Sequence, residues 1–130
     1  MIVNPVQEDK VKLKKCQLAV GTPGRVKQLL TEGHMSSDNI RLVVLDEADK
    51  LLEPSFLADT TAILNRLPAN KQVVALSATY PDQLARLAER FMRSPQHVRP
   101  GQASQVFIWQ LESALLPVRC LIVSNLSSNN

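Results

Sequence analysis

The sequence predicts an α/β fold in which a parallel β-sheet is flanked by helices. Short apolar runs alternate with longer stretches in which apolar residues recur every three or four positions, the patterns of strands and amphipathic helices. The clearest run, Ile40–Leu45, is nearly continuous in Val, Leu and Ile, as in a parallel strand that is buried on both faces. Three strand–helix units in succession favour right-handed crossovers within one sheet.

The composition limits the size and the class of the protein. Its 130 residues suffice for one domain, and 45% apolar against 21% charged residues argue against disorder throughout the chain. Aromatic residues make up only 4%, which argues against an RNA-binding face of stacked aromatic rings. The net charge of +3 permits contact with nucleic acid. We find no secretory signal and no apolar run of the ~18 residues that span a bilayer, so we expect no membrane association.

The first strand–helix unit follows a basic segment, residues 1–15, that we expect to be solvated. Cys16–Val20 has the apolar character of a short buried strand. Thr22 and Pro23 are typical of a helix cap and a first helical turn. The apolar residues that follow recur at helical spacing up to Gly33, which predicts the end of this helix.

The second and third units repeat this plan. The strand Ile40–Leu45 leads into a helical stretch that Pro54 interrupts, and Pro68 ends the helix that follows. Gln72–Leu76 is the third predicted strand, and an amphipathic helix after it begins at Pro81. These residues therefore predict three parallel strands joined by helical crossovers.

The pattern is weaker after the third unit. His97 and Val98 are consistent with one more short strand, and Val118–Val123 with another. Phe107–Leu116 is apolar and favours a helix. We find no residue in the tail, 100–130, that suggests chemistry.

Three polar clusters follow directly after predicted strands. They are Gly21–Arg25, Asp46–Asp49 and Ser77–Thr79. The carboxyl ends of parallel strands meet at one edge of a sheet, where open α/β sheets bind their ligands. The three clusters are therefore the candidates for a functional site.

Asp46 and Glu47 are the strongest candidates for catalysis. An apolar strand that ends in an acidic pair is the Walker B arrangement of nucleotide hydrolases. The first carboxylate can hold Mg²⁺, and the second can orient or deprotonate an attacking water. The alternative is an acidic helix start, where carboxylates interact favourably with the helix dipole.

The other two clusters offer groups that bind an anion. The turn at Gly21–Arg25 presents free backbone N–H groups at a helix start, and Thr22 adds a hydroxyl beside the charge of Arg25. A nucleic-acid phosphate is the natural ligand on a basic protein. Ser77 and Thr79 add two hydroxyls after the third strand. For both clusters the alternative is simple helix capping.

Together the clusters resemble motifs Ib, II and III of the DEAD-box RNA helicases. Their order and spacing match the first RecA-like domain of that family: Thr22-Pro23-Gly24-Arg25, Asp46-Glu47-Ala48-Asp49 and Ser77-Ala78-Thr79. The resemblance covers roughly Lys10–Arg99. Within the family, the Leu-Lys-Lys-Cys run before the first strand and the sequence Ser-Ala-Thr-Tyr-Pro most resemble the gemin-type helicases of the survival-of-motor-neuron complex.

The resemblance implies a role for each matching residue. Asp46 and Glu47 would be the catalytic residues of an ATP site, Asp46 binding the Mg²⁺ of ATP through water and Glu47 positioning the hydrolytic water. Asp49 would pair with the hydroxyls of Ser77 and Thr79 and so couple the nucleotide to the RNA site. RNA phosphates would be bound by the first motif, through Thr22, Gly24 and Arg25.

The resemblance also implies an incomplete helicase. Residues 16–99 would be the C-terminal half of a RecA-like ATP-binding domain, and residues 100–130 an unmatched tail for which disorder or an aberrant sequence is expected. The 130 residues contain no Gly-x-x-x-x-Gly-Lys-Ser/Thr, the loop that cradles the phosphates of ATP. We therefore expect a fragment of an ATP-dependent RNA helicase that binds ATP weakly and is inactive alone. The implied location is cytoplasmic or nuclear, and the implied partners are RNA and survival-of-motor-neuron complex proteins.

The absent strand of that loop would leave an apolar sheet edge uncovered, which is an aggregation risk. The tail contains apolar residues that could cover it: Val106, Phe107, Ile108, Leu111 and Leu115.

Two other hypotheses stay open. The first is a non-catalytic module that binds RNA or a partner protein. The second is a metal-dependent phosphohydrolase that uses Asp46, Glu47 and Asp49 and takes further ligands from elsewhere.

Overall fold

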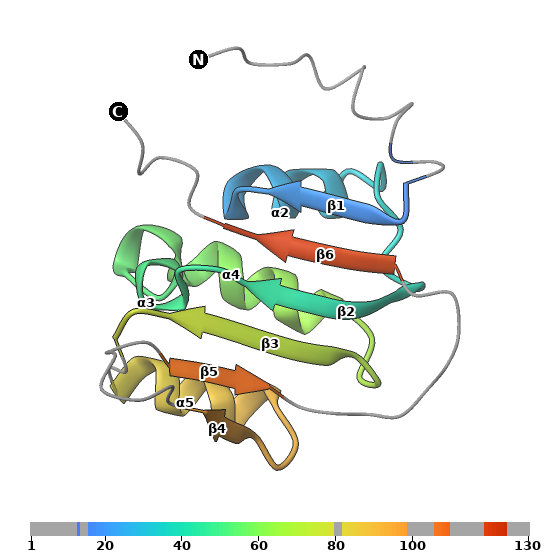
Figure 1. The fold of residues 1–130 in the computed structure, drawn as a ribbon. Helices are drawn as coiled ribbons and strands as arrows, with labels where there is room; N and C mark the ends of the chain where they lie inside the picture. The colour runs from blue at the N-terminus through green and yellow to red at the C-terminus, as the bar shows by residue number, and fades with distance from the viewer. Residues whose placement is uncertain (1–12, 14–15, 80–81, 99–105, 110–118, 125–130) are drawn as a thin grey trace.

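A six-stranded mixed β-sheet organises the protein (Figure 1). The computed structural model describes residues 13, 16–79, 82–98, 106–109 and 119–124. Four parallel strands lie side by side in this order: β1 (Leu18–Gly21), β6 (Arg119–Val123), β2 (Ile40–Leu45) and β3 (Gln72–Ser77). Two short strands extend the sheet beyond β3, with β5 antiparallel to both of its neighbours: β5 (Val106–Trp109) and β4 (Gln96–Val98). This confirms the predicted α/β fold with a parallel sheet.

The longer helices lie on one side of the sheet, as Figure 1 shows. The four helices among the described residues are α2 (Pro23–Thr31), α3 (Ala48–Leu51), α4 (Pro54–Arg66) and α5 (Asp82–Phe91). Right-handed crossovers that all advance in the same direction across a sheet place their helices on the same face. Pro23 stands in the first turn of α2, as the sequence predicts, and Pro54, which was expected to interrupt a helical stretch, stands in the first turn of α4.

The core lies between the helices and the inner face of the sheet. Alternate strand residues on this face are at most 1% exposed: Val43, Leu45, Val73, Ala75, Leu121 and Val123. They pack with buried helix residues that recur at helical spacing, among them Val26, Leu30, Ile63, Leu64, Leu84 and Ala88. Because β6 supplies two of the fully buried residues, it belongs to the core as fully as β2 and β3 do.

Strand β6 fills a position between β1 and β2. The crossover through α2 passes over one strand position, and β6 pairs there with both neighbours, so that Cys120 is in register with Leu18 on one side and with Leu42 on the other. Among the described residues, β1 has no other strand partner. Strand β6 therefore joins β1 to β2, and its residues Leu121 and Val123 lie in the core.

The tail therefore differs from the sequence-based expectation. Residues 106–109 and 119–124 are not disordered, because they complete the hydrogen bonding of parallel strands that would otherwise have open edges. The predicted strand at 118–123 is confirmed, whereas residues 106–109 form a strand and not the start of a helix. We expected apolar tail residues to cover an open sheet edge, and β5, which contains Val106, Phe107 and Ile108, pairs along the edge of β3. Leu111 and Leu115 lie outside the described residues, as does nearly all of 1–15.

The other face of the sheet carries no described helix and is also apolar. Gly21 faces α2, since a side chain there would meet Val26, so alternation directs Leu18 and Val20 to the opposite side. These two side chains are 53% and 56% exposed. None of the helices in the described ranges combines the length and the apolar character needed to cross a membrane.

Candidate functional site

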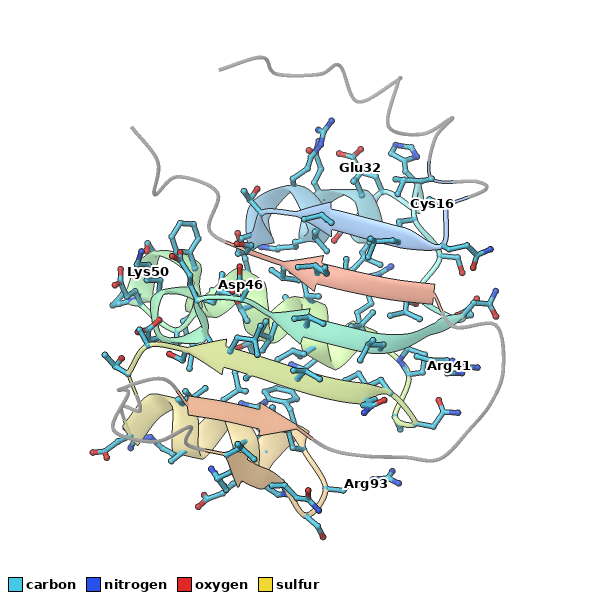
Figure 2. The ribbon with its side chains drawn as sticks, in the orientation of Figure 1. Cys16, Glu32, Arg41, Asp46, Lys50 and Arg93 are labelled. Carbon is cyan, nitrogen blue, oxygen red and sulfur yellow. The ribbon has the colours of Figure 1, made fainter. Side chains whose placement is uncertain are left out.

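The three polar clusters meet at the carboxyl edge of the parallel strands. Figure 2 shows Asp46 and Lys50 at this edge, and Cys16 and Arg41 at the opposite end of the strands. Strands β1, β2 and β3 run in the same direction, so the residues that follow each of them emerge together. The structure thus assembles the site that the sequence pattern predicts.

The Asp46 carboxylate is held by a hydrogen bond on each oxygen. The Glu47 N–H donates to Oδ1 at 3.1 Å, and the Ser124 hydroxyl donates to Oδ2 at 3.3 Å. The backbone N–H of Asp46 donates to the Val123 carbonyl oxygen at 2.9 Å, which continues the pairing of β2 with β6. Each carboxylate oxygen has further acceptor capacity, which can be directed at a hydrated cation.

Glu47 occupies a left-handed backbone conformation, with φ 52° and ψ 51°. This region is uncommon for a residue other than glycine, and such conformations concentrate at functional turns. Its carboxylate forms an ion pair with Lys50, Oε1 to Nζ at 3.2 Å. Glu47 is the N-cap residue of α3 but makes no side-chain cap hydrogen bond.

Asp49 joins the ends of β2 and β3. Its backbone N–H donates to Ser77 Oγ at 3.2 Å across 28 positions of sequence, and the Thr79 hydroxyl donates to Asp49 Oδ2 at 2.7 Å across 30. The Lys50 N–H donates to the other carboxylate oxygen at 3.0 Å. The contact between these three motif residues, implied by the resemblance, is present in the structure.

These contacts also control the charge of Asp49. Burial acts to raise the pKa of its carboxyl group, but the hydrogen bonds from Thr79, from the Lys50 N–H and with Ser77 together outweigh burial. The pKa of Asp49 therefore lies below its ordinary value of 3.8, and the group is an anion at neutral pH.

The loop Gly21–Arg25 leads from β1 into α2. Thr22 is the N-cap residue but makes no side-chain cap hydrogen bond, so the capping alternative does not explain its hydroxyl. The Arg25 guanidinium donates to Gln28 Oε1 at 3.0 Å. Lys27 pairs with Asp59 at 2.7 Å, which offsets the charge of an acid that lies beside Gly24. A helix start of this kind can bind an anion through its backbone N–H groups.

Sequence reasoning missed Ser124 and Lys50. The rule that identified the other clusters, a polar residue directly after a strand, also applies to Ser124, which follows the predicted strand at 118–123. The tail has no counterpart in the family pattern, so the resemblance gives no signal at Ser124. Lys50 carries no motif signal, and only the turn at Glu47 brings the two side chains together.

The donor set fits a Mg²⁺ ion that is shared with phosphates. Within the described ranges, no three His, Cys, Asp or Glu side chains are close enough to hold a metal ion. Mg²⁺ keeps several waters and commonly takes one or two carboxylates together with substrate phosphates, which is what Asp46 can offer. The same finding leaves the phosphohydrolase hypothesis without a ligand set in the described residues.

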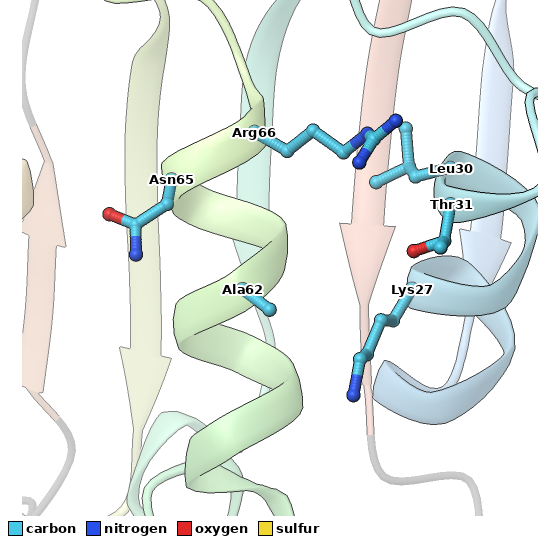
Figure 3. Close-up of a pocket in the computed structure, with 6 residues that line it drawn as sticks. All are labelled: Lys27, Leu30, Thr31, Ala62, Asn65 and Arg66. Atoms are coloured by element: carbon cyan, nitrogen blue, oxygen red, sulfur yellow. The ribbon is translucent and has the colours of Figure 1, made fainter.

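A hollow of about 290 Å³ lies between α2 and α4 (Figure 3). Lys27, Leu30 and Thr31 line it from α2, and Ala62, Asn65 and Arg66 from α4. None of the predicted site residues lines this hollow. It is therefore separate from the carboxyl-edge site.

The DEAD/DEAH box helicase family model matches residues 3–87, which is more than half of the chain. The chain belongs to the DEAD/DEAH box helicase family. This confirms the resemblance drawn from the three motifs.

Its relatives carry helicase names. The mouse protein "Probable ATP-dependent RNA helicase DDX20" is 52% identical over 96 residues, which cover 73% of this chain and 12% of the relative. The DEAD-box ATP-dependent RNA helicase CshA of Geobacillus kaustophilus is 43% identical over 86 residues, 66% of this chain and 18% of the relative. CshA of Listeria monocytogenes is 42% identical over 86 residues, 66% of this chain and 16% of the relative. The chain thus spans less than a fifth of the length of each of these relatives.

Proposed function

We propose that these residues form part of the nucleotide and RNA sites of an ATP-dependent DEAD-box RNA helicase, in which ATP hydrolysis is coupled to RNA remodelling. The observation that supports this most directly is the network at the carboxyl edge. Asp46 is hydrogen-bonded to Ser124, which in turn is hydrogen-bonded to Gly21. Asp49 is hydrogen-bonded to Thr79. The candidate catalytic residue Asp46 is thereby linked to the start of the candidate RNA-binding loop, and the candidate coupling residues Asp49 and Thr79 are linked to each other.

In this proposal the two acids have separate tasks. Asp46 holds Mg²⁺ through water, and the ion, when bound with ATP, offsets the charge on the phosphates. Glu47 orients the attacking water and accepts its proton. The ion pair with Lys50 restrains the Glu47 carboxylate near the turn.

The other residues bind RNA and transmit the state of the site. Thr22, Gly24 and Arg25 hold RNA phosphates through a hydroxyl, backbone N–H groups and a guanidinium, without reading sequence. The anionic carboxylate of Asp49 keeps its bond to Thr79 at neutral pH, so the ends of β2 and β3 move together.

Hydrolysis is proposed for a longer protein that contains this chain together with a phosphate-binding loop. In such a protein, we expect Glu47→Gln to abolish ATP hydrolysis and to leave ATP binding intact, because the amide cannot accept the proton from water. Steady-state ATPase assays and titration calorimetry measure the two properties. Glu53→Gln, an exposed acid just before α4, is the matched control. Unchanged turnover in Glu47→Gln would refute the role of this residue.

A second candidate function is a non-catalytic module that binds RNA phosphates, favoured by the N-cap hydroxyl of Thr22, which makes no side-chain cap hydrogen bond, and by the net charge of +3. For the 130-residue chain we expect oligouridine binding at low salt, measured by fluorescence anisotropy, and no measurable binding of ATP. Arg25→Ala should weaken RNA binding and lower the salt slope by about one unit. Arg41→Ala, at the opposite end of the strands, should do neither. The absence of RNA binding at low salt would reject this function.

We also propose that a longer protein with this chain associates with survival-of-motor-neuron complex proteins, in the cytoplasm or the nucleus. This extends the gemin-type resemblance of the sequence. Co-precipitation from cell extract with antibodies to that complex tests it, and recovery equal to that of an unrelated helicase would reject it.

A further inference from the structure

We propose that Ser124 is a positioning residue that holds the Asp46 carboxylate and ties it to the Gly21–Arg25 loop. The tasks of Asp46 and of the loop rest on the proposed function. The contact itself does not, since it is made by the folded chain alone. Ser124 lies beyond residues 3–87, which the family model matches, so the inference concerns a residue outside the recognised motifs.

Ser124 contacts both parts of the site through different atoms. Its hydroxyl donates to Asp46 Oδ2 at 3.3 Å, and its backbone N–H donates to the Gly21 carbonyl oxygen at 3.1 Å. The residue is only 6% exposed, so water competes little for either bond. One buried serine thus lies between the loop that leaves β1 and the acid that ends β2.

The hydroxyl is the part of Ser124 that carries the proposal. The bond to Gly21, and the bond from Asp46 to the Val123 carbonyl, are backbone contacts that any residue except proline can support. Of the groups of Ser124, the hydroxyl is the one that donates to Asp46 Oδ2. Replacing it should therefore free one carboxylate oxygen while β6 stays paired between β1 and β2.

The position of Ser124 gives the site a second link. Asp49 connects the end of β2 to β3 through Ser77 and Thr79. Asp46 connects the same strand end to β1 through Ser124. A displacement of the loop on phosphate binding would therefore reach Asp46 through two hydrogen bonds.

A double-mutant cycle on the full 130-residue chain tests the contact. Unfolding in urea is followed for Ser124→Ala, Asp46→Asn and the double variant. Each variant changes the unfolding equilibrium constant by some factor. We expect the factor for the double variant to differ about fivefold from the product of the two single-variant factors, because the same hydrogen bond to a charged acceptor is lost in each single variant but can be lost only once. Ser36→Ala with Asp46→Asn should be additive, and Ser124→Thr, which retains a hydroxyl, should behave like the wild type. Additivity of Ser124 and Asp46, or loss of stability in Ser124→Thr equal to that in Ser124→Ala, would overturn the positioning role.

Amide chemical shifts during titration with oligouridine test the link to the loop. In the wild type we expect shifts at Gly21–Arg25 and at Asp46. In Ser124→Ala the loop shifts should persist and the Asp46 shift should disappear, whereas Ser124→Thr should restore it. An Asp46 shift that survives in Ser124→Ala would overturn the link. If RNA shifts nothing in the wild type, the proposed RNA site and the link both fail, while the cycle still decides the contact between Ser124 and Asp46.

Discussion

The carboxylate of Asp49 accepts hydrogen bonds on both oxygens, one from the Thr79 hydroxyl and one from the Lys50 N–H. At the scale of single residues, these hydrogen bonds show how the fold sets the pKa of the Asp49 carboxyl group. Burial opposes the charged form, but the donors outweigh it and lower the pKa. The charge of Asp49 thereby also depends on β3 being correctly placed against β2.

The lowered pKa of Asp49 predicts how stability depends on pH. An acid with a lower pKa in the folded state contributes its stabilisation above the unfolded-state pKa and loses it as pH falls through the folded-state pKa. We therefore expect this contribution to be complete at neutral pH and to decline from about pH 5 downward. Asp49→Asn should flatten that part of the curve, as measured by urea unfolding at a series of pH values.

Glu89→Gln, on an exposed position of α5, is the matched control for this measurement. It should leave the acid limb of the curve close to that of the wild type. An identical acid limb in Asp49→Asn and Glu89→Gln would contradict the assigned cause.

The residue roles were only partly predictable from sequence. Asp49, Ser77 and Thr79 could be grouped in advance because a three-motif pattern marks them. Ser124 follows a predicted strand as those residues do, but its contact with Asp46 depends on which strands lie beside β6, and no local signal states that. The left-handed turn at Glu47 is likewise invisible in the sequence, since the residue is not a glycine.

At the scale of elements, the junction between β1 and α2 depends on the absence of a side chain. A Cβ atom at Gly21 would lie 2.9 Å from Val26 Cγ2, closer than such atoms approach in folded proteins. We expect Gly21→Ala to lower the free energy of unfolding by about 1–3 kcal/mol through overpacking. Combining it with Val26→Ala should cost less than the sum of the two single changes, because the smaller side chain makes room.

Gly24→Ala is the matched control for this junction. Its Cβ would lie 3.5 Å from Asp59 Oδ2, an ordinary contact, and alanine is a better helix former than glycine. Chemical denaturation of Gly21→Ala, Val26→Ala, their double variant and Gly24→Ala measures the free energy of unfolding of each. Strict additivity of Gly21→Ala and Val26→Ala would show that the two positions do not compete for space.

The sequence predicts a strand or a helix correctly where the periodicity of its apolar residues is strong. The prediction is unreliable where that periodicity is weak. The strands at 40–45 and 72–77 and the helices that start at Pro23 and Pro54 follow local rules. Residues 106–109 form a strand because the open edge of β3 offers backbone partners. A short apolar run has no periodicity that distinguishes a strand from a helix, so the segment against which it packs determines which of the two forms.

At the scale of the whole molecule, stability depends on a strand from the far end of the sequence. Leu121 is fully buried in the core, whereas its neighbour Ile122 is only half-buried. We expect Leu121→Ala to lower the free energy of unfolding by about 3 kcal/mol and Ile122→Ala by clearly less. Urea unfolding measures both losses. Equal losses would mean that β6 does not direct Leu121 into the core and Ile122 away from it.

The placement of β6 between β1 and β2 has a consequence for biosynthesis. The pairing of β1 with β6 joins residues about 100 positions apart, so closing it carries a large entropic penalty and favours slow folding. Among the described strands β1 pairs only with β6, so during translation this pairing has to wait for residues 119–123, while β2 and β3 can already pair with each other. The nascent chain therefore passes through a stage in which β1 and one edge of β2 are open, and a chaperone or a neighbouring chain on the polysome would meet them first.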